Sequence, residues 1–285
     1  MFKYTCNQND QGRTLYKISL KIFPNLPISK IEKMFRSKEI KVNNVRTNDK
    51  KMILQENDEI IFYCHYEQQP NIQKVNNNFD ILQIIYEDQN ILIVNKPNDI
   101  SMHGFKNCLD FQVLEYLKVD PKLTFKPSHI GRLDKETSGL VVYAKNYSTL
   151  RFLQENKSFE KTYILKNDFP LPFNKEIKNR ILIQDNQKSV LVYPIDSNFG
   201  KEASTIFFSQ NSTVYAQIIT GRKHQIRATA AWLGYPIYGD TKYNGISSNR
   251  LYLHCFKLKF NQNINNQELN YLSNKEFQAE PKDWN

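Results

Sequence analysis

The sequence lacks the features that mark secreted, membrane-spanning and metal-binding proteins. No apolar run approaches the roughly 20 residues that a membrane-spanning helix needs, and the amino terminus lacks the apolar core of a signal peptide. The 5 histidines are dispersed, with no metal-ligand spacing among them. No Cys-x-x-Cys pair occurs, so we expect neither a disulfide framework nor a cysteine-based metal site. The 4 cysteines are Cys6, Cys64, Cys108 and Cys255. These absences predict a cytoplasmic protein.

The composition is that of a globular protein with a basic surface. Hydrophobic residues make up 40% of the 285 residues and aromatic residues 13%, which argues against wholesale disorder. This length can bury at least one full core and allows two domains. The formal net charge of +10 indicates an anionic partner, most simply a nucleic acid.

The first part of the chain, residues 1–67, reads as a small separate domain. Leu15, Ile18 and Ile22 recur at helical spacing, and Pro24 ends that helix. Ser29 and Glu32 have the spacing of a capping box, which predicts that a second helix begins there. Short strands are expected at Ile40–Val42, at Val45 and at Ile60–Tyr63.

Basic residues gather on this small domain. They either form a solvated basic surface or track a phosphate backbone with salt-sensitive, sequence-poor affinity. The candidate RNA-binding residues are Lys30, Lys33, Arg36 and Lys38, accompanied by Lys41, Arg46, Lys50 and Lys51.

Residues 68–79 are polar, rich in asparagine and without periodicity, which predicts an interdomain linker. Residues 80–285 then alternate many strand-like runs with few helical ones, so we expect an α+β domain. Its sheet should be mostly antiparallel or mixed, with flanking helices and a central cleft. Strands are expected at residues 91–94, 140–144, 162–165, 181–183, 190–192, 205–208 and 214–219, and helices at 111–117 and 148–155.

The stretch from His129 to Leu140 is the most unusual in the chain. Gly131 and Gly139 allow backbone angles and close approaches that other residues resist. Thr137 and Ser138 can bond neighbouring backbone groups and fix the loop. Asp134 is then a carboxylate on a rigid loop at the entrance to a buried strand, a typical place for active-site groups. The alternative is an Asx-type turn before a strand.

A second dense stretch runs from Gly221 to Arg227 and leads into an alanine-rich helix that ends at Gly234. If Arg227 points inward it needs an anionic partner, because an unpaired buried charge costs several kcal/mol. Asp134 is the best candidate, and this pairing would keep Asp134 ionised. The alternative is a structural bridge without chemistry.

Together these stretches resemble the RluA-type pseudouridine synthases. The matching residues are Arg132-Leu133-Asp134 with Thr137-Ser138-Gly139, and also Lys96-Pro97, Lys161-Thr162-Tyr163, His224-Gln225-Ile226-Arg227, Gly239-Asp240 and Leu251-Tyr252-Leu253-His254. The basic domain resembles the αL RNA-binding domain of the fourth protein of the small ribosomal subunit. Asn44 and Asn57 stand where that family usually has glycine, and asparagine tolerates the left-handed conformation.

The resemblance implies an isomerase that breaks the C1′–N1 bond of uridine, turns the uracil over and rejoins it through C5. Asp134 would act either as the nucleophile or as the base that removes the 2′ proton. Arg227 would hold Asp134, and Leu253 would line the pocket. Tyr163 would stack on or under the flipped base, with assistance to proton removal from C5 as a further role. Glu136 is expected to be a solvated loop residue. The resemblance implies no cofactor and no metal.

Reaching a base in folded RNA requires extruding it from its stack. Arg132 is suited to fill the vacated position with its planar guanidinium. Lys96, Arg222 and Lys223 are expected to contact phosphates, or to be exposed cations without function.

We therefore expect a monomeric isomerase that acts on structured RNA, most simply ribosomal RNA of the large subunit, with no membrane partner. One alternative is a catalytically silent RNA-binding factor in ribosome assembly. Another is the same isomerase acting on transfer RNA.

Overall fold

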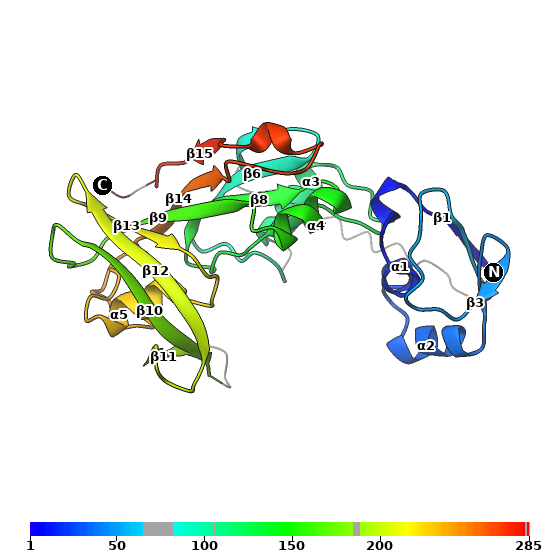
Figure 1. The fold of residues 1–285 in the computed structure, drawn as a ribbon, viewed down its shortest axis with the longest axis horizontal. Coiled ribbons are helices and arrows are strands. Elements are labelled where there is room, and N and C mark those ends of the chain that lie inside the picture. The colour runs from blue at the N-terminus through cyan, green and yellow to red at the C-terminus, as the bar shows by residue number, and fades with distance from the viewer. Residues whose placement is uncertain (65–81, 105–106, 185–188, 283, 285) are drawn as a thin grey trace. The chain divides into compact units, whose positions relative to one another are not determined.

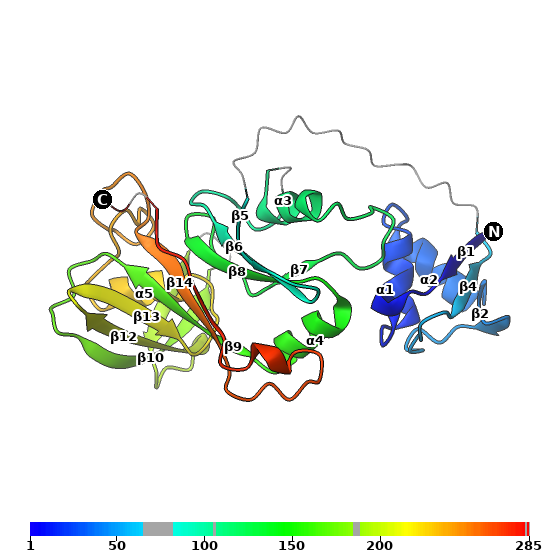
Figure 2. The same ribbon diagram turned by 90° about the horizontal axis from the view of Figure 1, so that it is seen from above.

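The computed structural model describes residues 1–64, 82–104, 107–184, 189–282 and 284. These residues form two compact units, drawn in Figures 1 and 2. The first contains residues 1–64 together with Leu114–Pro127 and Asn146–Ser148, and the second contains the other described residues. The predicted linker, residues 68–79, lies outside the described residues.

The first unit combines two helices with a four-stranded antiparallel sheet of order β1-β4-β2-β3. Asn43 and Asn44 form the tight turn between β2 and β3, and both have the positive φ expected of asparagine in place of glycine. Asn57 has a positive φ as well. The elements are β1 (Phe2–Thr5), η1 (Gln8–Asp10), α1 (Leu15–Ile22), α2 (Ile28–Arg36), β2 (Ile40–Val42), β3 (Val45–Thr47) and β4 (Glu59–Phe62).

The core of this unit is built as the helical spacing predicts, since Leu15, Ile18 and Ile22 of α1 are all buried. The predicted capping box is wrong. Pro27 occupies the N-cap of α2 and makes no side-chain capping bond, so the helix begins before Ser29 can cap it. The carboxylate of Glu32 forms an ion pair with Lys50 instead.

The second unit is organised around a large mixed sheet of order β11-β10-β12-β13-β9-β14-β8-β6-β5, with β15 added to β14 and β7 to β8. Its pairs are antiparallel except for β14 with β8, which is parallel. The α+β class with a mostly antiparallel sheet is therefore confirmed. The strands are β5 (Gln83–Glu87), β6 (Ile91–Lys96), β7 (Ser128–Ile130), β8 (Ser138–Ala144), β9 (Phe159–Leu165), β10 (Asn174–Ile183), β11 (Val190–Pro194), β12 (Lys201–Gln210), β13 (Thr213–Ile218), β14 (Leu253–Phe260) and β15 (Glu276–Gln278).

The two central strands β6 and β8 are buried, as the sequence predicts. Every residue of β6 and of β8 is buried, and the two strands pair from Ile91 with Ala144 to Lys96 with Gly139. A strand buried on both faces reads as a continuous apolar run, which is what both sequences show. The catalytic-loop candidates, residues 131–137, lead directly into this rigid centre.

Three helices and a short turn complete the second unit. α3 (Leu109–Tyr116) and α4 (Tyr147–Glu155) belong in part to each unit, and η2 (Asn270–Leu272) precedes β15. α5 (Gln225–Trp232) packs against β10, β11 and β12, which lie near it in Figure 1. Leu233 is the C-cap of α5, and Gly234 follows it with φ +89°, the predicted glycine C′ position.

No helix in the described part of the chain combines the length and apolar character that crossing a membrane requires.

Candidate active site

The loop that carries Asp134 is held at both ends by backbone geometry. Gly131 has φ +74°, and the amide of Thr137 donates to the carbonyl of Asp134 at 3.1 Å, which closes a turn. Gly139 has φ +117°, and a Cβ there would lie 2.4 Å from the backbone nitrogen and oxygen of Cys255. Glycine is therefore required for β14 to approach β8, and the close approach fixes where the loop ends.

Thr137 and Ser138 do not act as predicted, because neither hydroxyl bonds neighbouring backbone. The Thr137 hydroxyl is buried and has no hydrogen-bond partner among the described residues. Ser138 Oγ lies 2.8 Å from His254 Nδ1 and accepts from Arg250 Nη2 at 2.7 Å. His254 Nε2 lies 2.8 Å from the carbonyl of Ala279, so it is the protonated nitrogen, and Nδ1 accepts from Ser138. Burial lowers the pKa of His254 to about 4, so the ring is neutral.

Lys96, expected to contact phosphate, is instead fully buried at the end of β6. Its Nζ donates to the carbonyls of Pro97 at 2.9 Å, Ile100 at 2.8 Å and Lys135 at 2.9 Å. These three bonds use every proton of an ammonium group, so none remains for RNA. Burial lowers the pKa of Lys96 to about 7, although the charges of nearby carboxylates, Asp134 first, oppose the shift. The prediction that Lys96 contacts phosphate is therefore wrong. The Lys96 ammonium group instead binds backbone carbonyls, including that of Lys135 in the Asp134 loop.

Arg227 lies on α5 with a side chain only 2% exposed, as the inward orientation requires. Its main partner is Asp240, which is 0% exposed. Arg227 Nε donates to Asp240 Oδ2 at 2.7 Å and Nη2 donates to Oδ1 at 2.8 Å, a bidentate pair of the strongest kind. Burial lowers the pKa of Arg227, but the hydrogen bonds and charge of Asp240, reinforced by Asp134 and Glu136, raise it by more.

The remaining nitrogen of Arg227 faces two carboxylates of the loop. Nη1 lies 3.5 Å from Asp134 Oδ2 and 3.3 Å from Glu136 Oε2. The structure therefore brings Asp134 and Arg227 together, while Asp240 anchors the guanidinium. The Asp134 side chain is 26% exposed, so one guanidinium compensates its charge while part of the carboxylate stays accessible to a bound molecule.

Glu136 is not the solvated loop residue that the sequence suggested. Besides Arg227, it accepts from Lys242 Nζ at 2.9 Å. Burial raises the pKa of Glu136, but Lys242, a backbone hydrogen bond and Arg227 together lower it to about 2. It therefore remains an ion-paired carboxylate across the physiological range and helps hold the loop on α5.

His224 and Tyr243 complete the surroundings of Arg227. His224 precedes α5 in the left-handed conformation, with Nε2 3.9 Å from Asp134 Oδ1 and Nδ1 2.8 Å from the Tyr243 hydroxyl. Burial lowers the pKa of His224, although the charge of Asp134 opposes this. The Arg227 guanidinium carbon lies 5.7 Å from the centre of the Tyr243 ring, within range of a cation–π contact.

Tyr163 and Leu253 are both buried strand residues. Tyr163 on β9 pairs with Ala216 and with Cys255, and Leu253 on β14 pairs with Leu165. Burial raises the pKa of Tyr163 well above its usual value, and the charge of Asp134 adds to the shift. The phenol is therefore neutral near physiological pH.

Arg132 and Arg222 are exposed cations of the same unit, and Lys223 is half-buried. Arg132 is two residues from Asp134, on the same loop. Arg222 Nε donates to the carbonyl of Glu202 at 2.9 Å, so part of its guanidinium is fixed to the backbone of β12.

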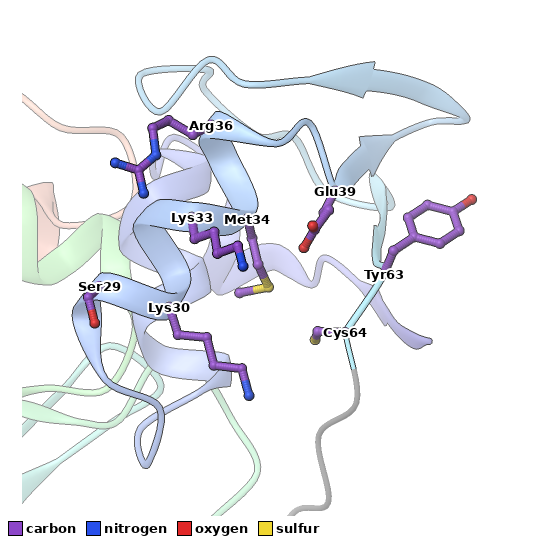
Figure 3. A pocket seen from close by; sticks show the side chains of 8 residues that line it. All are labelled: Ser29, Lys30, Lys33, Met34, Arg36, Glu39, Tyr63 and Cys64. Atoms are coloured by element: carbon purple, nitrogen blue, oxygen red, sulfur yellow. The ribbon is translucent and has the colours of Figure 1, made fainter.

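Three of the four candidate RNA-binding cations of the first unit line a pocket of about 540 Å³, shown in Figure 3. Lys30, Lys33 and Arg36 extend from α2 on one side of the pocket, while Glu39 and Tyr63 lie on the opposite side of the pocket. These three cations and Lys38 are all exposed. The remaining lining residues are Ser29, Met34 and Cys64.

Sequence reasoning missed the parts played by Asp240, Lys242, His224 and Tyr243. Gly239-Asp240 and His224 were visible as motifs, but nothing in their spacing assigns them to Arg227 or to Asp134. The assembled site offers two partly exposed carboxylates on a fixed loop, Asp134 and Glu136, a guanidinium that compensates their charge, and a neutral buried phenol. That set can supply a nucleophile or a base.

Comparison with known proteins gives a consistent result. Residues 90–232, about half of the chain, match the family model described as RNA pseudouridylate synthase. An uncharacterized RNA pseudouridine synthase of Mycoplasma capricolum is 38% identical, and the match covers 100% of this chain and 99% of that protein. Ribosomal large subunit pseudouridine synthase C of Escherichia coli K12 is 32% identical, with 82% of this chain and 81% of that protein covered.

A solved structure of human RNA pseudouridylate synthase domain containing 4 has the same fold. Its TM-score is 0.53 at 22% identity, and the match covers 70% of this chain and 89% of that one.

Proposed function

We propose that this chain, which belongs to the RNA pseudouridylate synthase family, converts uridine to pseudouridine in the RNA of the large ribosomal subunit. The family assigns the isomerisation, and the proposal adds the substrate and the residues that act on it. Relatives about 30% identical over most of their length, described as large-subunit synthases, support the choice of substrate.

The observation that carries the proposal is the environment of Asp134. This carboxylate is partly exposed, lies 3.5 Å from a guanidinium, and stands on a loop fixed to α5 and to Lys96. An ion pair that only stabilises the fold does not need an accessible carboxylate. Complete burial would exclude water, and the attraction between the two charges is stronger where water is excluded. An accessible, charge-compensated carboxylate on a rigid support suits a group that reacts with a bound molecule.

In the proposed reaction Asp134 acts on the ribose of a uridine that has left its stack. As nucleophile it would form a bond to C1′ while the C1′–N1 electrons leave with the uracil. As base it would remove the 2′ proton while the same bond breaks. In both routes the uracil turns and C5 bonds to C1′, as the Asp134–C1′ bond breaks in the first route and as Asp134 returns the proton to C2′ in the second. C5 then loses its proton and N1 gains one. The atoms balance without a redox partner, since substrate and product are isomers.

Arg227 keeps Asp134 in place in this proposal, and Tyr163 contacts the extruded base as a neutral phenol. Its raised pKa makes it a hydrogen-bond donor rather than a phenolate base near physiological pH. Leu253 contributes apolar surface, and Arg132 fills the space that the extruded base leaves. Arg222 and Lys223 contribute positive charge for the RNA backbone.

We further propose that residues 1–67 are an αL-type RNA-binding domain, joined by residues 68–79 to a catalytic domain of residues 80–285. The exposed cations around the pocket on α2 support phosphate binding there, because phosphates are bound by clustered Lys and Arg side chains. The protein would act as a cytoplasmic monomer.

Mapping of pseudouridine in total RNA tests the proposal. Cells that lack the gene should lose pseudouridine at one or more positions of large-subunit RNA, and the wild-type gene should restore it. A gene encoding Asp134→Asn should not. Loss of pseudouridine only in transfer RNA would show that transfer RNA is the substrate, while the proposed reaction would stand. No loss anywhere would favour a silent RNA-binding factor and reject the proposal.

A further inference from the structure

Two histidines and one carboxylate meet in the second unit, outside the surroundings of Asp134 described above. His103 lies in the segment before α3, Asp110 in the first turn of α3 and His129 in β7. One ligand atom from each lies within 4.8 Å of the others. Because the three come from separate segments, no sequence spacing could have revealed them, and the sequence led us to expect no metal site.

Backbone hydrogen bonds hold Asp110 and His129 in place, together with the residues that precede His103. The amides of Leu109 and Asp110 donate to the carbonyls of Ser101 and Met102, at 2.9 and 3.0 Å, which holds the segment next to His103 against the start of α3. His129 is paired with Tyr143 of β8. Bringing these side chains together therefore requires little ordering of the backbone when a ligand binds.

The spacing of the ligand atoms approaches the spacing found around a first-row divalent ion. His129 Nε2 lies 3.8 Å from Asp110 Oδ2, and two ligands of tetrahedral zinc are separated by about 3.4 Å when metal–ligand distances are near 2.1 Å. The rings of His103 and His129 are stacked, with an interplanar angle of 22° and centroids 6.4 Å apart. Bringing ligand atoms that lie within 4.8 Å of one another to a spacing of about 3.4 Å would require side-chain shifts of about 1 Å.

Asp110 already has the outer partner that metal-binding carboxylates usually have. The Tyr143 hydroxyl donates to Asp110 Oδ1 at 2.7 Å, which orients the carboxylate and turns Oδ2 toward His129. The Nδ1 atom of His129 is buried and has no hydrogen-bond partner among the described residues.

We propose that His103, Asp110 and His129 bind one divalent transition-metal ion, with Zn²⁺ as the best match. Two imidazoles and one carboxylate form a familiar zinc ligand set, in which water takes the fourth position. Only one ligand is anionic, and the positive charge of Arg132 acts on His129, so we expect micromolar rather than nanomolar affinity. The ion would join α3 and the segment before it to the strand that leads into the Asp134 loop.

The experiment is a metal titration of the full chain, produced without a polyhistidine tag and stripped with EDTA. Calorimetry with Zn²⁺ and the visible spectrum of bound Co²⁺ should report one ion per chain in tetrahedral coordination. Zn²⁺ should also raise the melting temperature of the wild type. His103→Ala, an exposed position, and Asp110→Asn should each weaken binding at least about tenfold and remove the thermal shift.

Tyr143→Phe should weaken binding by about tenfold through loss of the bond that orients Asp110. The matched control is Glu115→Gln, which makes the same acid-to-amide change at an exposed position of α3 and should bind metal as the wild type does. Absence of micromolar binding by the wild type would overturn the proposal. Equal binding by the wild type and His103→Ala would overturn it as well, because the ion would then lie elsewhere.

Discussion

Arg227→Met is expected to destabilise the second unit strongly, because it leaves a carboxylate buried without its cation. Methionine keeps much of the arginine volume, so the change removes charge and hydrogen bonds rather than packing. Asp240 is 0% exposed and would lose bonds of 2.7 and 2.8 Å, retaining a backbone bond from Lys242. Removing one partner of a buried ion pair costs about 3–5 kcal/mol. Asp134 and Glu136 add little, since both reach solvent.

For a unit of this size, that loss corresponds to a fall in melting temperature of roughly 6–20 °C. Calorimetric unfolding of the purified variant beside the wild type measures it. Arg151→Met is the matched control, because Arg151 pairs with Glu155 on the surface of α4 at 57% exposure. It should change the free energy of unfolding by less than about 0.5 kcal/mol. An Arg227→Met protein as stable as this control would refute the reasoning.

The double variant Arg227→Met with Asp240→Leu separates stability from chemistry. Removing both charges should recover most of the lost stability, since no unpaired carboxylate remains buried. Pseudouridine formation should stay low, because Asp134 still lacks its guanidinium. Recovery of activity along with stability would show that the contact between Arg227 and Asp134 is not needed for the reaction.

Three further predictions concern the loop and the basic pocket. Lys96→Met should lower the melting temperature, because three carbonyls lose their donor, yet leave the salt dependence of RNA affinity unchanged in a filter-binding assay. Lys30→Gln or Lys33→Gln should instead reduce the slope of log affinity against log salt by about one each, without changing the melting temperature. The pKa of Glu136 is lowered to about 2 in the folded state, so its stabilising contribution is full above the unfolded value near 4.5 and disappears as pH falls toward 2. Chemical unfolding of Glu136→Gln should accordingly show a shallower loss of stability across that window, and an unchanged acid profile would contradict the ion pairs.

The strands could be predicted from sequence because burial on both faces produces unbroken apolar runs. Ile91–Val94 and Leu140–Ala144 became β6 and β8, and both are buried throughout. The contact of Arg227 with Asp134 followed from a general requirement, namely that a buried guanidinium needs an anion. The same requirement could not identify Asp240 as the main partner, because several carboxylates satisfy it and only the path of the chain selects among them.

The burial of Lys96 could not be predicted from its residue type. Lysine usually extends into solvent, which favoured phosphate contact, but here three carbonyls converge on the ammonium group. Backbone acceptors leave no trace in a sequence. The capping box failed for a related reason, since Pro27 permits the helix to begin earlier than the side-chain pattern indicates.

The most direct test of the central claim compares Asp134→Asn with Asp99→Asn on large-subunit RNA transcripts. Asp99 is an exposed aspartate whose nearest ion-pair partner, Lys135, is 3.6 Å away, so its variant controls for the loss of one negative charge. We predict that Asp134→Asn binds RNA with wild-type affinity and forms no pseudouridine, while Asp99→Asn forms it at the wild-type rate. Pseudouridine formation by Asp134→Asn at the wild-type rate would contradict the assignment of Asp134 as the reacting carboxylate.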